Sequence, residues 1–359
     1  MSRYEALQEE LRARPRRWLV TGAAGFIGSH LLESLLRLGQ TVVGLDNFST
    51  GKRANLDDVF ARVGQAARAR FTLLEGDVRE LGACSAAMAG VDAVLHEAAL
   101  GSVPRSLADP LASHSNNVDG FVNVLMAAHG AGVRRVVFAS SSSVYGDALE
   151  SPKVEARMGR PLSPYAATKL VNEIYAELFF RTHGIDSVGL RYFNVFGPRQ
   201  DPNGAYAAVI PRWTERVLAG KQCVVYGDGG TSRDFCFVAD VVQANLLAAC
   251  ATAVEVSPRI FNVGAGAQTT LAQLFLAIRE RAARHRTLTG SEVLLAEPER
   301  AGDIRHSLAS IERARASLGY EPAYTVAQGL DQTVDFFAAP RRTGDIVPGA
   351  TAPALEEAS

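Results

Sequence analysis

The feature that most constrains the fold is a glycine-rich turn between a short apolar strand and an amphipathic helix. Apolar residues predict a strand over 18–21 and, at helical spacing, a helix over 27–38 that ends at Gly39. Glycines between such elements let the backbone approach a pyrophosphate, and the helix N-terminus directs its amides and dipole toward it. The alternative is that these glycines serve only a tight turn. We predict a dinucleotide-binding turn formed by Gly22, Gly25, Phe26, Ile27 and Gly28.

Strands and helices alternate along the first half of the chain. Strands separated by helices predict an α/β fold with a doubly wound, Rossmann-like parallel sheet and right-handed crossovers. Apolar runs predict further strands over 41–45, 71–74, 93–96, 136–140, 187–191, 234–238 and 260–263, and helices over 117–129, 165–183 and 241–251.

The alternation weakens after residue 191, where Gly and Pro become frequent. We therefore expect a smaller C-terminal substrate-binding lobe, and a disordered tail rich in Pro and small residues. The expected units are an N-terminal helix (1–16), a cofactor-binding domain (17–191 and 234–263), the substrate-binding lobe (192–233 and 264–340) and the tail (341–359).

Composition argues against several classes of partner. With 37 Lys and Arg against 38 Asp and Glu, the chain has no net field to attract nucleic acid or an anionic membrane. The four cysteines are scattered and form no metal-binding pattern with histidines. The N-terminus is too charged for a signal peptide, and no apolar run approaches the roughly 20 residues of a membrane span. We expect a cytoplasmic protein with no metal site.

Asp46 follows the second predicted strand and favours NAD over NADP. A carboxylate there accepts hydrogen bonds from the adenosine ribose hydroxyls and repels a 2′-phosphate. Lys52 and Arg53 lie close in sequence and leave NADP as an alternative. Asp77, with Val78, follows the third strand and is expected at the adenine edge, with loop capping as its alternative.

Tyr165 and Lys169 lie four residues apart on one predicted helix that begins at Ser163-Pro164. This spacing brings the ammonium near the phenol. A neighbouring cation and the positive charge of an oxidised nicotinamide favour phenolate, so we expect the pKa of Tyr165 to move down toward the operating pH and Tyr165 to act as a base. Alone, the pair would describe a solvated helix surface. The serines 140–143 follow another strand, however, and bring hydroxyls to the same carboxyl edge of the sheet.

Several motifs resemble those of the extended short-chain dehydrogenase/reductase superfamily, and within it the nucleotide-sugar 4-epimerases. The resemblance covers 17 to about 337 and is closest to bacterial UDP-N-acetylglucosamine 4-epimerases. It rests on the spacing of Gly22, Gly25 and Gly28, on Leu45-Asp-Asn47, Gly76-Asp77, Ser141, Tyr165-x-x-x-Lys169 and Leu190-Arg-Tyr-Phe-Asn194-Val-Phe-Gly197, and on Gly101-Ser-Val-Pro-Arg-Ser106, Asp201-Pro-Asn-Gly-Ala-Tyr206 and Thr231-Ser-Arg-Asp-Phe235.

The resemblance implies a role for many residues. Ser141 would be the catalytic hydroxyl beside Tyr165 and Lys169, although the four serines could also form a polar loop. Asn117 would support the helix and the lysine, with an N-cap as its alternative. The cofactor set would add Asn47 and Ala98. Substrate contacts would be Ser102, Ser142, Ser143, Tyr192, Asn194, Gln200, Tyr226, Arg233, Arg300, Asp303 and Ser307.

The implied activity is interconversion of UDP-GlcNAc and UDP-GalNAc by transient oxidation at C4, with NAD regenerated in each cycle. Arg233 and Arg300 would hold the diphosphate bidentately, although arginines are also common on surfaces. Ser307 replaces a bulky tyrosine of some family members and leaves room for an acetamido group. A homodimer through helices around 111–129 and 165–183 is expected by analogy.

Three other activities remain as alternatives. A UDP-uronic acid epimerase could use Arg105 or Arg305 for the carboxylate, and UDP-glucose could also turn over. A dehydratase is disfavoured because Ser142-Ser143 replaces the Asp-Glu pair of such enzymes. A non-catalytic NAD sensor is disfavoured because Tyr165 and Lys169 are both retained.

Overall fold

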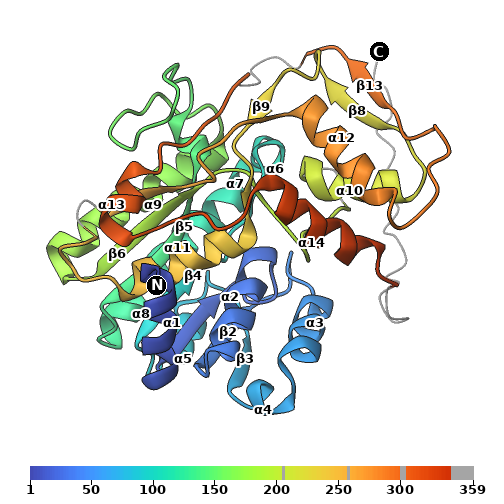
Figure 1. The fold of residues 1–359 in the computed structure, drawn as a ribbon. Coiled ribbons are helices and arrows are strands. Elements are labelled where there is room, and N and C mark those ends of the chain that lie inside the picture. Colours follow the sequence, from blue (N-terminus) through green and yellow to red (C-terminus); the bar gives the residue numbers. More distant parts are fainter. Residues whose placement is uncertain (204–206, 257–258, 300–304, 341–359) are drawn as a thin grey trace.

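A seven-stranded parallel sheet forms the centre of the computed structural model, which describes residues 1–203, 207–256, 259–299 and 305–340 (Figure 1). In order across the sheet, its strands are β3 (Phe71–Glu75), β2 (Thr41–Asp46), β1 (Arg17–Thr21), β4 (Ala93–His96), β5 (Arg135–Ser141), β6 (Asp186–Tyr192) and β11 (Ile260–Val263). The strand order reverses beside β1, where ligands bind in open α/β sheets.

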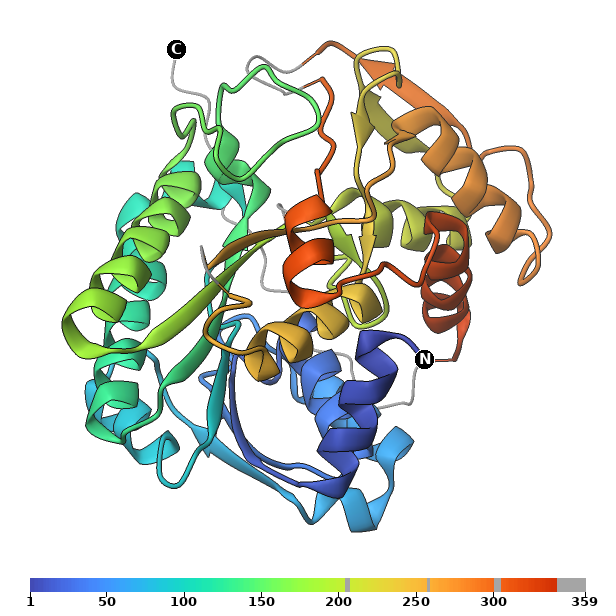
Figure 2. The same ribbon diagram turned by 60° about the vertical axis from the view of Figure 1, so that its left-hand side comes forward.

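Helices cover both faces of the sheet (Figure 2). They are α1 (Arg3–Ala13), α2 (Phe26–Arg37), α3 (Arg53–Val63), α4 (Gln65–Arg68), α11 (Val238–Cys250) and α13 (Glu312–Leu318) with one apolar core, and α5 (Leu81–Ala87), α8 (Gly120–Gly130) and α9 (Pro164–His183) with the other. Along β1, Trp18 and Val20 contribute to the first core and Leu19 to the second, as the two-residue period of a strand requires. The predicted doubly wound parallel sheet is therefore confirmed.

The C-terminal part adds a smaller lobe beside the carboxyl edge of the sheet (Figure 1). Its elements are α10 (Val209–Leu218), α12 (Leu271–Ala282), α14 (Val326–Ala338) and the short strands β8 (Cys223–Tyr226), β13 (Leu294–Glu297), β9 (Ser232–Arg233) and β12 (Thr269–Thr270). Trp213, Phe275 and Ile278 belong to a third apolar core between these helices.

Two expected elements differ in the structure. The strand expected over 234–238 is reduced to β10 (Cys236–Phe237), which pairs with β7 (Val195–Phe196) outside the main sheet. It is short because α11 already begins at Val238. The helix expected to begin at residue 117 is interrupted by a π-helical turn over Ser115–Asp119, and α8 begins only at Gly120.

The division into domains stays a prediction, although β11 pairs with β6 in the main sheet as expected for the segment 234–263. The tail from residue 341 lies outside the described residues. Among the helices of the described part, none is long and apolar enough to cross a membrane.

Candidate active site

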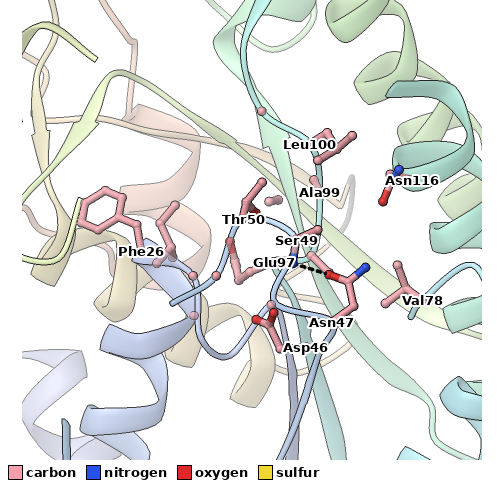
Figure 3. Close-up of a pocket in the computed structure, with 18 of the residues that line it drawn as sticks. Phe26, Asp46, Asn47, Ser49, Thr50, Val78, Glu97, Ala99, Leu100 and Asn116 are labelled. Atoms are coloured by element: carbon pink, nitrogen blue, oxygen red, sulfur yellow. Dashed lines mark hydrogen bonds between the residues drawn. The ribbon is translucent and has the colours of Figure 1, made fainter. Parts of the chain in front are cut away.

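A cavity of about 420 Å³ opens at the carboxyl edge of the sheet (Figure 3). Parallel register brings the strand ends together, since Thr21 pairs with both Leu45 and His96 and Ser141 pairs with Tyr192. The residues following these ends form much of the wall. Of the predicted residues, the lining includes Gly22, Gly25, Phe26, Ile27, Gly28, Asp46, Asn47, Val78, Ala98, Ser141, Tyr165, Lys169, Tyr192 and Gln200.

The glycine turn fits a dinucleotide pyrophosphate. Gly22 adopts a φ of 68°, and a Cβ on Gly28 would lie 2.0 Å from the Gly22 carbonyl oxygen, so a side chain has no space there. Gly25 caps α2 without any side-chain hydrogen bond to the first-turn amides. Those amides and the helix dipole therefore face the cavity and suit an anion.

Asp46 lies at the end of β2 and lines the same cavity. Its Oδ2 accepts a hydrogen bond from the Ala24 amide at 2.8 Å, and its Oδ1 accepts one from the Phe48 amide at 2.8 Å. The carboxylate thus ties the glycine turn to the end of β2 and retains lone pairs for ribose hydroxyls. Because this negative charge faces the cavity, a 2′-phosphate is disfavoured.

The two basic residues that kept NADP as an alternative cofactor form ion pairs with other side chains. Lys52 Nζ lies 2.8 Å from Asp201 Oδ1, and Arg53 Nη2 lies 2.6 Å from Glu75 Oε2. Neither residue belongs to the cavity lining. The residues present fit NAD.

Asp77 stays a predicted contact of the adenine edge. It lies outside the described lining, and its carboxylate is bound by Arg79 at 2.7 Å and by the Asn47 amide at 2.8 Å. The Arg79 guanidinium holds the pKa of this carboxyl down at about 2. Asp77 therefore positions Asn47, which does line the cavity, and its neighbour Val78 lines the cavity directly.

Tyr165 sits in the first turn of α9, where three contacts fix the backbone. Ser163 caps the helix by accepting a hydrogen bond from the Ala166 amide at 3.2 Å, and Pro164 occupies the first helical turn. The Tyr165 amide donates to Ser106 Oγ at 3.0 Å. Ser106 belongs to α6 (Val103–Ala108), so the motif around it anchors the start of the tyrosine helix.

Lys169 lies one turn further along α9, as the spacing predicted. Its Nζ donates to the Ala139 carbonyl oxygen at 2.9 Å and lies 5.9 Å from the centre of the Tyr165 ring. Burial lowers the pKa of Lys169 to about 8.

The pKa of Tyr165 is raised in the protein without cofactor. Burial raises it above 10.0, and the hydrogen-bond interaction with Ser141 opposes this increase only in part. Desolvation of the phenolate outweighs the neighbouring groups here, and the expected decrease with oxidised nicotinamide bound stays a prediction.

The four serines separate into different environments. Ser140 Oγ donates to Glu173 Oε1 at 2.6 Å in the interior, whereas Ser141 interacts with Tyr165 and accepts from the Ser143 amide at 3.1 Å. Ser142 and Ser143 begin a 3-10 turn over Ser142–Tyr145 and lie outside the described lining. Ser141 is thus the hydroxyl placed beside the phenol.

Asn117 does not line the described cavity but supports it. Its side chain pairs with the backbone of Leu100 and donates to Thr168 Oγ1 at 3.1 Å. Asn117 therefore links the loop after β4 to α9 beside Lys169. It lies inside the π-helical turn rather than at the N-cap of α8.

Several expected substrate contacts lie away from the cavity lining. Ser102 caps α6, and the Asn194 amide donates to the Asp234 carbonyl at 3.1 Å. Arg233 Nη1 donates to the carbonyls of Ser232 and Arg305. Tyr226 ends β8, and Ser307 is half-buried next to Ser232, to which its amide donates at 3.2 Å. Arg300 and Asp303 lie outside the described residues.

The sequence reasoning missed other lining residues, foremost Glu97. Its position directly after the strand 93–96 was the available signal, because ligands in open α/β sheets bind at the carboxyl ends of the strands beside the point where the strand order reverses. The other missed residues are Leu45, Ser49, Thr50, Gly51, Gly76, Ala99, Leu100, Gly101, Asn116, Ala139, Ser140 and Val195.

The cavity combines a glycine turn at the first strand with a tyrosine–lysine pair and a serine. This combination defines a nicotinamide-dependent enzyme of the extended short-chain dehydrogenase/reductase type. The model of the NAD dependent epimerase/dehydratase family matches residues 18–264, and the chain belongs to this family. NAD is its cofactor.

Two curated relatives and two solved structures are similar over most of the chain. The chain is 38% identical to a UDP-glucose 4-epimerase of Mycolicibacterium smegmatis, over 89% of this chain and 98% of that protein. It is 33% identical to UDP-glucuronate 4-epimerase 5 of Arabidopsis thaliana, over 90% of this chain and 77% of that protein. A UDP-N-acetylglucosamine 4-epimerase from Methanobrevibacter ruminantium in complex with UDP-N-acetylmuramic acid aligns with a TM-score of 0.81 at 36% identity. This alignment covers 90% of this chain and 98% of that chain. A Thermus thermophilus UDP-glucose 4-epimerase complex with NAD aligns with a TM-score of 0.77 at 36% identity. This alignment covers 89% of this chain and 98% of that chain.

Proposed function

We propose that this protein interconverts UDP-GlcNAc and UDP-GalNAc by reversible oxidation at C4 of the sugar. It is an enzyme of the NAD-dependent nucleotide-sugar 4-epimerase type. The observation that carries the proposal is the presence of Tyr165, Ser141 and Lys169 in one cavity with the glycine turn.

Tyr165 is the proposed base that removes the proton of the sugar 4-hydroxyl. Ser141 interacts with its phenol and can share that proton. Lys169, held by the Ala139 carbonyl, offers a cation that stabilises a phenolate and can bind ribose hydroxyls. When bound beside these residues, NAD would supply the hydride acceptor and donor that reversible oxidation at C4 requires.

The smaller lobe is the proposed holder of the nucleotide, because the sugar must rotate while the other end stays bound. Arg233 on β9 and Arg300 offer planar forks for the diphosphate, with Asn194 between the lobes and Asp303 for the ribose. Tyr192 and Gln200 line the cavity and are proposed sugar contacts. Ser102, Ser142, Ser143 and Tyr226 are proposed to join them when substrate binds.

Ser307 supports the acetylated sugars as substrates. Its small side chain stands where the resemblance places a tyrosine in some members, and the solved UDP-N-acetylglucosamine 4-epimerase is 36% identical over 90% of the chain. Of the two arginines considered for a uronate, Arg305 is paired with Asp228 at 2.7 Å. UDP-glucose and UDP-glucuronate remain the competing substrates, since the curated relatives act on these sugars.

The test is proton NMR of the purified protein incubated with UDP-GlcNAc, UDP-glucose or UDP-glucuronate and no added cofactor. We expect UDP-GalNAc from UDP-GlcNAc, and near-complete loss of product in Tyr165→Phe. Ser307→Tyr should reduce turnover of UDP-GlcNAc more than that of UDP-glucose. If the acetylated sugar stays unchanged after NAD is added while another sugar turns over, the substrate assignment is wrong. Bound NAD with no turnover of any sugar would instead favour an NAD sensor.

We also propose a homodimer through α8 and α9, together with α7 (Pro110–His114). These helices contact one another and leave large apolar side chains in solvent. Leu111 on α7 is 81% exposed, and Met126 on α8 and Ile174 and Leu178 on α9 are also exposed. A second copy of the chain would bury them. Light scattering should give twice the monomer mass, and Ile174→Glu should reduce it to that of one chain.

A further inference from the structure

A carboxyl group that the proposed chemistry leaves unused lies in the catalytic cavity. Glu97 directly follows β4 and is among the lining residues drawn in Figure 3. Tyr192 of β6 donates a hydrogen bond to Glu97 Oε1 at 2.7 Å, and Asn245 of α11 donates to the Tyr192 oxygen at 2.8 Å. Two neighbouring elements thus hold the carboxyl group in place.

The charged and titratable groups around Glu97 come from three elements. From α9, Lys169 and Tyr165 both interact electrostatically with it. From β6, Tyr192 is its hydrogen-bond partner. His96 of β4 precedes it in the chain, and burial lowers the pKa of that imidazole to about 3, so it stays neutral near pH 7.

Glu97 therefore shares one cavity with the only ammonium in the described lining and with the proposed base, and burial shifts the pKa of all three groups. In such surroundings an anion favours protonated Lys169 and opposes ionisation of Tyr165. A structural carboxylate would be expected to form an ion pair within hydrogen-bond distance, yet Lys169 Nζ donates to Ala139.

We propose that Glu97 is a positioning residue that sets the protonation state of Tyr165 and Lys169 through its negative charge. This inference rests on the proposed roles of these two residues. Burial raises the pKa of Glu97 to about 7, while Tyr192 and Lys169 oppose the rise. Its charge therefore changes near neutral pH, and with it the balance between phenol, phenolate and ammonium.

The test is a titration of the Tyr165 phenol by ultraviolet difference absorbance, without substrate. The difference between wild type and Tyr165→Phe gives the titration of the Tyr165 phenol with Glu97 present. The difference between Glu97→Gln and the double variant Glu97→Gln/Tyr165→Phe gives it without the Glu97 charge. We expect the pKa of Tyr165 to fall by about one unit when the charge is removed. Both limbs of the pH–rate profile should also move to lower pH in Glu97→Gln, because the pKa of Lys169 falls as well.

Three controls separate charge from structure. Glu97→Asp keeps the charge and should titrate like wild type, and Glu75→Gln removes an exposed carboxylate at the end of β3 and should leave Tyr165 unchanged. Tyr192→Phe removes the hydrogen bond to the carboxylate and should raise the pKa of Glu97, read from the infrared band of its protonated form.

The proposal is overturned if Glu97→Gln leaves the Tyr165 titration unchanged, or if Glu97→Asp shifts it as far as Glu97→Gln does. A wild-type infrared titration in which Glu97 stays protonated throughout the ionisation of Tyr165 would also contradict it, because no negative charge would then act on the phenol, and this result does not depend on the folding of a Glu97 variant. These titrations need no turnover. A failure of the proposed epimerase activity would appear in the NMR assay and not in the titrations, so the two failures can be distinguished.

Discussion

A buried ion pair joins α9 to β6 beside Ser140, the residue before the proposed catalytic serine. Arg191 on β6 binds Glu173 on α9 through Nε at 2.9 Å and through Nη2 at 2.7 Å, and Ser140 donates to the same carboxylate at 2.6 Å. Both charged side chains are almost fully buried, 3% and 7% exposed. The free energy of unfolding should therefore depend strongly on both charges being present.

We predict that Glu173→Gln lowers the free energy of unfolding by about 3–5 kcal/mol, the usual cost of leaving one buried charge without its partner. The amide can still accept one hydrogen bond, but its NH2 group would face Arg191, which only donates. Urea denaturation followed by circular dichroism measures the change. Epimerase activity should fall as well, because Ser140 adjoins Ser141.

Glu177→Gln is the matched control on the same helix. Glu177 pairs with Arg181 at 2.7 Å, but these side chains are 46% and 72% exposed, so the change should be at most about 1 kcal/mol. Replacing both Arg191 and Glu173 by Met should cost less than the sum of the two single replacements, because no unpaired charge remains buried. Similar small losses for Glu173→Gln and Glu177→Gln would refute the reasoning.

Three further predictions follow from single contacts. Gly28→Ala should weaken NAD binding at least tenfold by calorimetry, because its Cβ would lie 2.0 Å from the Gly22 carbonyl oxygen and displace the turn. Ser106→Ala should cost about 1 kcal/mol in urea denaturation and lower kcat, because the Tyr165 amide loses its acceptor. Burial raises the pKa of Asp240 to about 6, so its ionisation destabilises the fold progressively as the pH rises from about 4 through 6. In Asp240→Asn, the decrease in the free energy of unfolding between pH 4 and pH 8 should be about 2–3 kcal/mol smaller than in wild type, measured by denaturation at both pH values.

Each of these has an outcome that would contradict it. Gly82→Ala in α5 is the control for Gly28, since nothing lies within 4 Å of the added Cβ, and equal effects of the two on NAD binding would rule out the steric argument. A Ser106 variant with wild-type kcat would show that the α6 contact does not position the base. An unchanged pH dependence in Asp240→Asn would place the titration on another carboxyl group, such as Asp234, whose pKa burial also raises to about 6.

Local pattern predicted much of the fold. The first strands and α2, α9 and α11 begin and end within a few residues of the expected positions, because apolar period, glycine turns and the Ser163 cap act over neighbouring residues. The same reasoning predicted the cavity residues Gly22, Asp46, Tyr165 and Lys169, whose places depend on strand ends and helix spacing.

Contacts between distant segments decided the rest. Asp77 accepts a hydrogen bond from Asn47, 30 positions earlier in the chain, and Glu97 enters the cavity beside Tyr192, 95 positions further along the chain. Burial raises the pKa of Tyr165, and the extent of that burial depends on the whole surrounding fold. The sequence by itself determined the elements and the residues that carry the chemistry, since period and turn residues act locally. Only the tertiary structure decided which side chains share one cavity, because packing and burial are set by residues far apart in the chain.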